Sequence, residues 1–175
     1  MASGKAYGVD RDYQVTCRDV LVHRRPELVP WSEDGIDIAF KLPDTTWTFD
    51  VALKSADQSI VVAECRRRIE PVKQDDVAAF ALKVESLRRS QEHPVSAFFF
   101  AKTHHQLGAV RVGNYWEVEV VVLAEDAKPP GFNVVFHTYD EERERRLRHF
   151  VMHIPMTQLS LATHAPTVIE TPNDP

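Results

Sequence analysis

The chain has 175 residues, of which 43% are hydrophobic and 27% charged, and its formal net charge at pH 7 is −5. This length and composition predict one soluble globular domain with a substantial core and room for an added C-terminal element. This net negative charge excludes a nucleic-acid-binding protein that relies on overall positive charge, so a nucleic acid would have to bind at a local basic patch.

Two features of the sequence bear on the compartment. Cys17 and Cys65 are far apart and lack the spacing of metal ligands, which indicates a reducing environment without a disulfide framework. No apolar run approaches the roughly 18 residues that a membrane helix needs, and the first ten residues lack a signal-peptide core. We therefore expect a cytoplasmic protein with no membrane partner.

The N-terminal half of the sequence predicts three antiparallel strands. Residues 1–12 show no pattern and are expected to form a loose N-terminus, whereas residues 13–28 fit either a short helix or an extended segment. Short turn sequences separate the next three segments, so we expect an antiparallel meander. The predicted strands span residues 36–43, 47–55 and 59–67.

The second predicted strand alternates apolar and polar residues, which indicates two distinct faces. One face would carry Trp47, Phe49, Val51 and Leu53, and the other Thr48, Asp50, Ala52 and Lys54. The third strand is rich in β-branched residues, yet its apolar run ends at Glu64, and Cys65 and three arginines follow.

The hydrophobic period changes after residue 74 and predicts a helix. Asp75 or Asp76 could cap its start, and Arg88 and Arg89 suit the negative end of its dipole. The apolar positions at helical spacing are Val77, Phe80, Val84 and Leu87. Residues 95–102 are apolar throughout, which is typical of a central strand covered on both faces.

The rest of the chain predicts a short helix within residues 103–116, a strand at 117–126, an edge strand at 132–139 and a charged helix at 140–154. The order indicates an α/β sandwich with a mixed sheet. We divide the chain into a loose N-terminus (1–12), an α/β domain (13–128), a C-terminal strand and charged helix packed on it (129–160) and a flexible tail (161–175).

Asp50 and Glu64 are the candidate chemical residues. If the hairpin pairing brings their faces together, two carboxylates converge beside Arg66. Two hard oxygen donors suit Mg²⁺, which can activate a water and stabilise charge on a phosphodiester. Plainer explanations stand beside this one: Asp50 as an exposed strand residue, and Glu64 as the ion-pair partner of a neighbouring arginine.

The sequence around these carboxylates resembles the restriction-endonuclease-like superfamily, the PD-(D/E)xK nucleases, and within it the Mrr-like and Holliday-junction-resolvase-like branches. The resemblance rests on Asp50, on VVAECRR at 61–67, on KQDDVAAF at 73–80 and on VSAFFFAK at 95–102. It implies an αβββαβ core with a central mixed sheet flanked by helices. It also implies that Mg²⁺ or Mn²⁺ is held by Asp50, Glu64 and the main-chain carbonyl of Cys65, with DNA as the partner and a homodimer as the assembly.

Arg66 departs from the pattern of this family, whose members carry a lysine there. Arginine supplies charge but essentially never loses its proton, so it would serve badly if the group must handle a proton of the attacking water. Lys54, Lys73 and Lys83 are candidates for a substitute lysine, and Gln74 lies where related nucleases often have a supporting glutamine.

Other patterns carry less chemistry. His149 and His153 have zinc-ligand spacing on a helix but lack a third ligand and the glutamate of the metalloprotease motif. The Cys65 thiol is expected to fill the core, because no base is positioned to activate it.

Two functions remain open. The first is metal-dependent hydrolysis of DNA phosphodiesters, with Asp50, Glu64, Arg66 and Gln74 as catalytic residues and Glu33 and Asp37 as outer ligands. The second is a catalytically inactive nuclease-fold protein that serves as a binding or scaffolding module, which the acidic charge and the arginine favour. An inactive site would have Arg66 folded onto Glu64 as an internal counter-ion.

Overall fold

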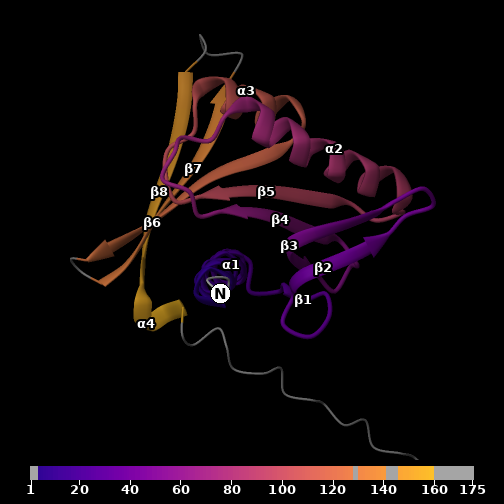
Figure 1. The fold of residues 1–175 in the computed structure, drawn as a ribbon, viewed down its shortest axis with the longest axis horizontal. Coiled ribbons are helices and arrows are strands. Elements are labelled where there is room, and N and C mark those ends of the chain that lie inside the picture. The colour runs from indigo at the N-terminus through magenta and orange to yellow at the C-terminus, as the bar shows by residue number, and fades with distance from the viewer. Residues whose placement is uncertain (1–3, 128–129, 141–145, 160–175) are drawn as a thin grey trace, which may run out of the picture.

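The computed structural model describes residues 4–127, 130–140 and 146–159. In this part of the chain an eight-stranded mixed sheet has α1 on one face and α2 and α3 on the other (Figure 1). The helices are α1 (Gly4–Arg24), α2 (Gln74–Ser90), α3 (Leu107–Tyr115) and α4 (Met156–Leu159). The strands are β1 (Val29–Pro30), β2 (Ile36–Lys41), β3 (Thr46–Lys54), β4 (Ile60–Arg66), β5 (Val95–Ala101), β6 (Val118–Ala127), β7 (Pro130–Asp140) and β8 (Arg146–Pro155).

The sheet combines antiparallel flanks with a parallel centre. Its order is β1-β3-β4-β5-β6-β7-β8, and β2 also pairs with β3. Strands β2, β3 and β4 form the expected antiparallel meander, and β6, β7 and β8 form a second one. Strands β4, β5 and β6 are parallel, so each step between them needs a crossover, which α2 and α3 provide.

The predicted fold class is confirmed. Elements α1, β2, β3, β4, α2 and β5 follow one another in the order αβββαβ, and helices flank the mixed sheet on both faces. Residues 4–12, which the sequence predicts to be loose, belong to α1, and Tyr13–Arg24 take the helical one of the two alternatives. No helix of the described residues is long and apolar enough to cross a membrane.

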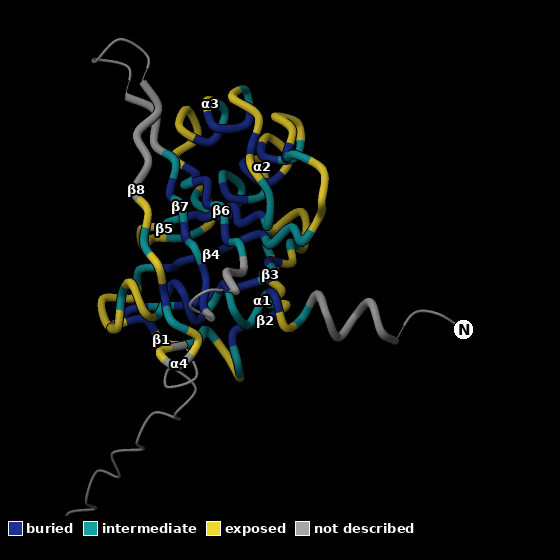
Figure 2. Tube along the Cα trace, turned by 90° about the vertical axis from the view of Figure 1, so that its left-hand side faces the viewer, coloured by how far each residue is buried: buried dark blue, intermediate teal, exposed yellow. Residues whose placement is uncertain are grey.

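Two apolar clusters fill the layers on either side of the sheet, where the trace in Figure 2 is mostly buried. The cluster on the α1 side includes Cys17, Leu21, Val51, Leu53 and Phe100. The cluster on the side of α2 and α3 includes Phe49, Phe80, Val84, Leu87 and Phe99. Each helix thus covers its face of the sheet with an apolar stripe, and the burial of this surface is the main favourable contribution to folding.

Helix α2 and strand β5 match their predictions closely. The four apolar residues expected at helical spacing on α2 are all buried, and β5 is a central strand between two parallel neighbours. The cap differs, because Lys73 is the N-cap residue and its backbone N–H donates to Asp76 Oδ2 at 3.2 Å. Asp76 therefore helps to close the first turn from inside the helix.

The C-terminal segments correct two predictions. The predicted edge strand is β7, which lies between β6 and β8, so β8 takes the edge. The predicted charged helix is instead strand β8 over Arg146–Pro155, with residues 141–145 outside the described part. Pairing explains this outcome, because β7 offers a continuous antiparallel partner from Asp140 to Gly131, and tertiary pairing overrides local helix propensity.

The single apolar face predicted for β3 is divided between the two sides of the sheet, with Trp47 and Phe49 on the α2 side and Val51 and Leu53 on the α1 side. Phe49 packs there with Phe40 and Phe80, at ring-centroid distances of 5.6 and 6.1 Å. The change of side occurs across Asp50, which is the residue where β3 leaves its ladder with β4.

Candidate active site

The two candidate carboxylates flank the point where β3 and β4 separate. The antiparallel ladder runs from Lys54–Ile60 to Val51–Ala63 and ends one step before Asp50 and Glu64. Beyond that point Asp50 Oδ2 accepts the backbone N–H of Cys65 at 2.6 Å. The opening between the strands thus begins with a carboxylate that is fixed to the facing backbone.

The environment of Asp50 raises its pKa from the usual value to about 6. Burial is the largest cause, and the negative charge of Glu64 is the second. The Cys65 N–H, the Arg66 guanidinium and a hydrogen bond with Gln14 act in the opposite direction. The strand register, extended by one step, places Asp50 opposite Glu64, so the charge of one carboxylate affects the titration of the other.

Glu64 is held between two cations. It is only 4% exposed and lies on the same face of β4 as Val62, toward α2. Its Oε1 lies 2.5 Å from Arg66 Nη2, and its Oε2 accepts a hydrogen bond from Lys83 Nζ at 3.2 Å. A buried carboxylate needs such compensation, since an unpaired buried charge is strongly unfavourable.

Lys83 is the lysine that reaches the site. It comes from the middle of α2, beside the buried Val84, and its side chain is 25% exposed. Lys54 lies instead with its Nζ 5.7 Å from the centre of the Trp31 ring, and the exposed Lys73 precedes the helix. Of the three candidates for a substitute lysine, therefore, Lys83 is the one that hydrogen-bonds a site carboxylate.

The side chain and the backbone of Cys65 face different surroundings. Its side chain packs with the α1-side cluster that contains Cys17, and burial raises the pKa of the thiol well above its usual range. Its backbone N–H points to Asp50, while the carbonyl of the next residue, Arg66, accepts the Lys102 N–H on the β5 side. Since polar groups of successive strand residues point to opposite neighbours, the Cys65 carbonyl faces the same side as Asp50.

A third carboxylate lies near the opening but in a more exposed position. Asp37 on β2 has a positive φ of 54°, and its Oδ1 accepts a hydrogen bond from Gln14 Nε2 at 3.0 Å. Gln14 also lowers the pKa of Asp50, so this α1 side chain lies close to both carboxylates. No sequence pattern pointed to Gln14, because residues 13–28 fit either a helix or an extended segment. Its position became meaningful only with α1 packed against β2 and β3.

Two predicted site residues lie elsewhere. Gln74 starts α2, and its Oε1 would lie 2.8 Å from a Cβ added to Gly108, so its side chain is packed against α3. Lys83 follows nine residues later, which corresponds to roughly 13 Å along the helix axis. Glu33 is exposed in the turn before β2 with a φ of 46°, and within the described residues it has no recorded ion pair.

The donor set of the site consists of oxygen atoms. Among the described residues, no group of three or more His, Cys, Asp or Glu side chains is arranged to hold a metal. Asp50, Glu64 and the Cys65 carbonyl nevertheless fit Mg²⁺, which is usually bound through one or two carboxylates and completes its shell with waters and substrate phosphates. His149 and His153 lie on a strand, so the helical spacing on which a zinc pair would depend is absent.

Comparison with known proteins yields one partial structural match. No protein-family model and no curated protein matches the chain. The solved structure of EndoMS in its apo form aligns with 61% of this chain and 44% of that chain, with 24% sequence identity and a TM-score of 0.40. The chain thus aligns with less than half the length of the EndoMS chain.

Proposed function

We propose that the chain hydrolyses DNA phosphodiesters in a metal-dependent reaction, as a small member of the restriction-endonuclease-like superfamily. The observation that carries this proposal is the pair of converging carboxylates at the opening between β3 and β4, one of which is bonded by a helix lysine. Asp50, Glu64 and the main-chain carbonyl of Cys65 would hold Mg²⁺ or Mn²⁺. A bound ion of this kind would activate a water and stabilise charge on the phosphodiester.

Lys83 would take the part that the motif lysine has in the family. An ammonium group is a compact donor that can approach an attacking water more closely than a planar guanidinium can. Its distance of 3.2 Å from Glu64 Oε2 keeps it beside a metal ligand. The lysine ammonium group that is missing at position 66 would therefore be supplied by Lys83 from α2. Arg66 would contribute positive charge only.

Arg66 would bind the scissile phosphate. Its guanidinium is anchored to Glu64 through Nη2, and its side chain is 36% exposed, so part of its planar fork faces solvent. Arg67 and Arg68 follow, with Arg68 Nη1 lying 3.6 Å from Asp76 Oδ1. Arg66 and Arg68, both on the α2 side, would supply the local basic charge that an acidic chain needs in order to bind nucleic acid.

Asp50 would act as a ligand only when it is ionised. Its pKa of about 6 means that the ion competes with a proton for this carboxylate below neutral pH. Metal affinity and cleavage should therefore both fall as the pH drops through about 6. Gln14 and the Cys65 N–H would stabilise the ionised form, because both favour the charged carboxylate.

A second function is favoured by one specific observation. Both oxygens of Glu64 are already engaged by cations of the chain itself, one by Arg66 and one by Lys83. This arrangement is the internal neutralisation expected of a site that has lost its chemistry. The chain would then be an inactive nuclease-fold protein that serves as a binding or scaffolding module.

Isothermal titration with Mn²⁺ at pH 8 separates the two functions. If the nuclease proposal holds, the wild-type protein binds Mn²⁺ and Glu64→Gln weakens this binding at least tenfold while the variant stays folded. An absence of Mn²⁺ binding in both proteins would overturn the nuclease proposal and support the inactive module.

Cleavage of plasmid DNA with Mn²⁺ or Mg²⁺ tests the role of Lys83. We expect Lys83→Met to lower the rate by about 100-fold or more, the contribution typical of a positioned acid–base group. Lys73→Met removes an equal charge outside the carboxylate pair and should keep most of the activity. Equal losses of rate in Lys83→Met and Lys73→Met would show that only the overall positive charge matters. If Arg66→Lys cleaves faster than the wild type, the lysine is needed at position 66 and Lys83 does not replace it.

A further inference from the structure

Arg66 occupies one oxygen of a proposed metal ligand in this structure. Residues 64 and 66 are two positions apart on β4, so their side chains lie on the same face of the strand. Arg66 Nη2 lies 2.5 Å from Glu64 Oε1, while Lys83 Nζ lies 3.2 Å from Oε2. A metal ion can therefore bind this carboxylate fully only after a cation of the chain itself has moved away.

Arg66 is the cation that can move away more readily. Its side chain is 36% exposed at the end of β4, whereas that of Lys83, in the middle of α2, is 25% exposed. Arg66 Nε is also buried and, within the described residues, has no hydrogen-bond partner. Because a buried donor without a partner is unfavourable, this position of the guanidinium is stabilised less than its contact with Glu64 alone would suggest.

The backbone of Arg66 can stay in place while its side chain turns. The Arg66 carbonyl accepts the Lys102 N–H at 3.2 Å, and the residue is in register with Ala101 of β5. The movement is thus confined to the side-chain torsions of one arginine, which have several staggered positions available. No strand or helix has to shift for Glu64 to be released.

A phosphodiester is an anion that can compete with Glu64 for this guanidinium. Guanidinium groups bind phosphate oxygens through two parallel N–H···O hydrogen bonds, as they bind carboxylates. A phosphate bound to Arg66 would leave Glu64 Oε1 available to a metal ion. It would also offset the positive charge of Arg66, which otherwise repels a divalent cation at this position.

We infer that Arg66 couples phosphodiester binding to metal binding: it blocks Glu64 in the free protein and releases it when a DNA phosphate takes the guanidinium. This inference rests on the proposed function and adds the regulation of its site. Because coupling between two ligands is reciprocal, the phosphodiester tightens metal binding and the metal tightens phosphodiester binding. The neutralised Glu64 is then the resting state of a working site.

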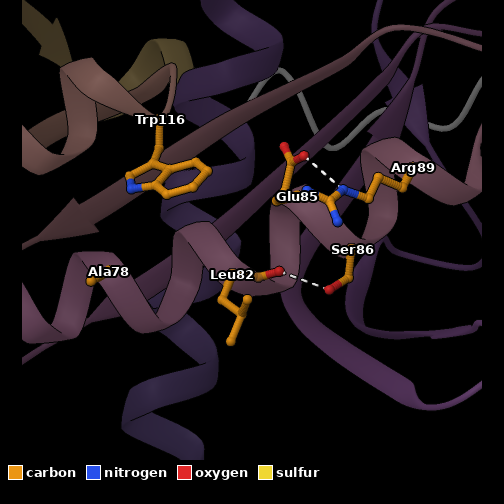
Figure 3. Close-up of a pocket in the computed structure, with 6 residues that line it drawn as sticks. All are labelled: Ala78, Leu82, Glu85, Ser86, Arg89 and Trp116. Carbon is orange, nitrogen blue, oxygen red and sulfur yellow. Dashed lines mark hydrogen bonds and ion pairs between the residues drawn. The ribbon is translucent and has the colours of Figure 1, made fainter.

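A second arginine–glutamate pair of α2 provides a matched control. Arg89 Nε donates to Glu85 Oε1 at 2.9 Å, and Figure 3 shows this pair near Trp116. The Arg89 side chain is 78% exposed, and the residue follows Lys83 by six positions, which is roughly 9 Å along the helix axis. Arg89→Ala therefore removes the same charge and the same kind of ion pair as Arg66→Ala, but outside the site.

Isothermal titration of Mn²⁺ at pH 8, with and without excess diethyl phosphate, tests the coupling. Diethyl phosphate is a phosphodiester monoanion, and potassium chloride replaces it at equal ionic strength in the reference titration. A titration of Mn²⁺ into diethyl phosphate alone corrects for their direct association. We expect diethyl phosphate to tighten Mn²⁺ binding to the wild-type protein by about fivefold or more, as is typical of coupled sites.

The two alanine variants locate the coupling. Without diethyl phosphate, Arg66→Ala should bind Mn²⁺ about fivefold or more tightly than the wild type, and diethyl phosphate should have no further effect. Arg89→Ala should match the wild type in both titrations. Circular dichroism melting shows whether the variants are folded, and the diethyl phosphate effect on the wild type does not depend on them.

The outcomes separate this inference from the proposed function. Mn²⁺ binding that is equal in the wild type and Arg66→Ala, or that does not respond to diethyl phosphate in the wild type, would overturn the coupling and leave the nuclease proposal in place. An equal gain of affinity in Arg89→Ala would also overturn it, because net charge would then explain the effect. No Mn²⁺ binding in the wild type or Arg66→Ala, even with diethyl phosphate, would overturn both.

Discussion

The two edges of β4 differ in how far their backbone pairing with the neighbouring strand extends. Toward β5 the strand stays paired from Ile60 to Arg66, whereas toward β3 the pairing ends at Ala63. Residues 64–66 are therefore held by backbone pairing on the β5 side, the closed edge, whereas on the β3 side, the open edge, the backbone ladder has ended and the Asp50 carboxylate accepts the Cys65 N–H instead. This arrangement holds the candidate catalytic side chains on a strand that is fixed along its other edge.

The same contrast applies to energetics. On the closed edge Phe99, in register with Glu64, is completely buried and packs at 5.8 Å from Phe80, measured between ring centres. On the open edge a carboxylate is buried next to another, and the pKa of Asp50 rises to about 6 as a result. The closed edge stabilises the fold, and the open edge is an unfavourable feature of the unliganded protein.

Phe99→Ala breaks the closed edge and should have the largest effect on stability. Truncation of a fully buried phenylalanine removes apolar contacts with the Phe80 and His105 rings and leaves a cavity, for a loss of about 3–5 kcal/mol. Urea denaturation measures this change. Phe99→Leu serves as the control, with an expected loss below about 1.5 kcal/mol. A loss below that value for Phe99→Ala would mean that β5 is not the rigid support of the site.

Asp50→Asn changes the open edge and should act in the opposite direction at pH 8. The folded protein holds the Asp50 proton more tightly than the unfolded chain does, because the folded pKa is raised from 3.8 to about 6. This contribution to stability is complete below about pH 4 and is lost as the pH rises through about 6. A shift of about 2.2 pKa units corresponds to roughly 3 kcal/mol, which is an upper estimate.

We therefore expect Asp50→Asn to raise the free energy of unfolding at pH 8 by about 1–3 kcal/mol and to leave it nearly unchanged at pH 4. The asparagine Oδ1 can still accept the Cys65 N–H, so the variant removes the charge and keeps this hydrogen bond. Denaturation at several pH values measures the effect. If the variant and the wild type differ equally at pH 4 and pH 8, then the ionisation of Asp50 does not oppose folding.

Added Mn²⁺ sharpens the comparison, because it should offset most or all of the stability difference between Asp50→Asn and the wild type. A ligand that binds the folded state alone stabilises it by about 2.7 kcal/mol at 100 times its dissociation constant. At pH 8 the wild type should gain this stability and Asp50→Asn should not. A thermal shift of equal size in both proteins would place the metal elsewhere.

Local patterns predicted the closed edge well. The continuous apolar run of residues 95–102 and the helical period from Val77 to Leu87 are signals carried by neighbours in sequence, and both elements form as expected. The pairing of β8 depends on a partner strand rather than on its own residues. Its mixed charges therefore favoured a helix, and the prediction was wrong.

The open edge was only partly predictable. Asp50 and Glu64 stood out because carboxylates follow apolar strand residues, and the structure brings them together. Which lysine joins them depends on how α2 crosses the sheet, so sequence spacing could not separate Lys83 from Lys54 and Lys73. Gln14 depends likewise on the docking of α1, which no local pattern describes.

Gln14→Ala tests this last contact and should have the smallest effect. Gln14 favours the ionised form of Asp50, so its removal should raise the pKa of Asp50 further, by less than about one unit. The midpoint of the pH dependence of stability should move upward by the same amount, and Mn²⁺ binding should require a higher pH. Thr16→Ala, which removes a hydroxyl bonded only to the Asp12 carbonyl of its own helix, is the matched control. An unchanged midpoint in Gln14→Ala would mean that Gln14 interacts with Asp37 but does not affect Asp50. The pKa of Asp50 would then be set by residues of β3 and β4 alone.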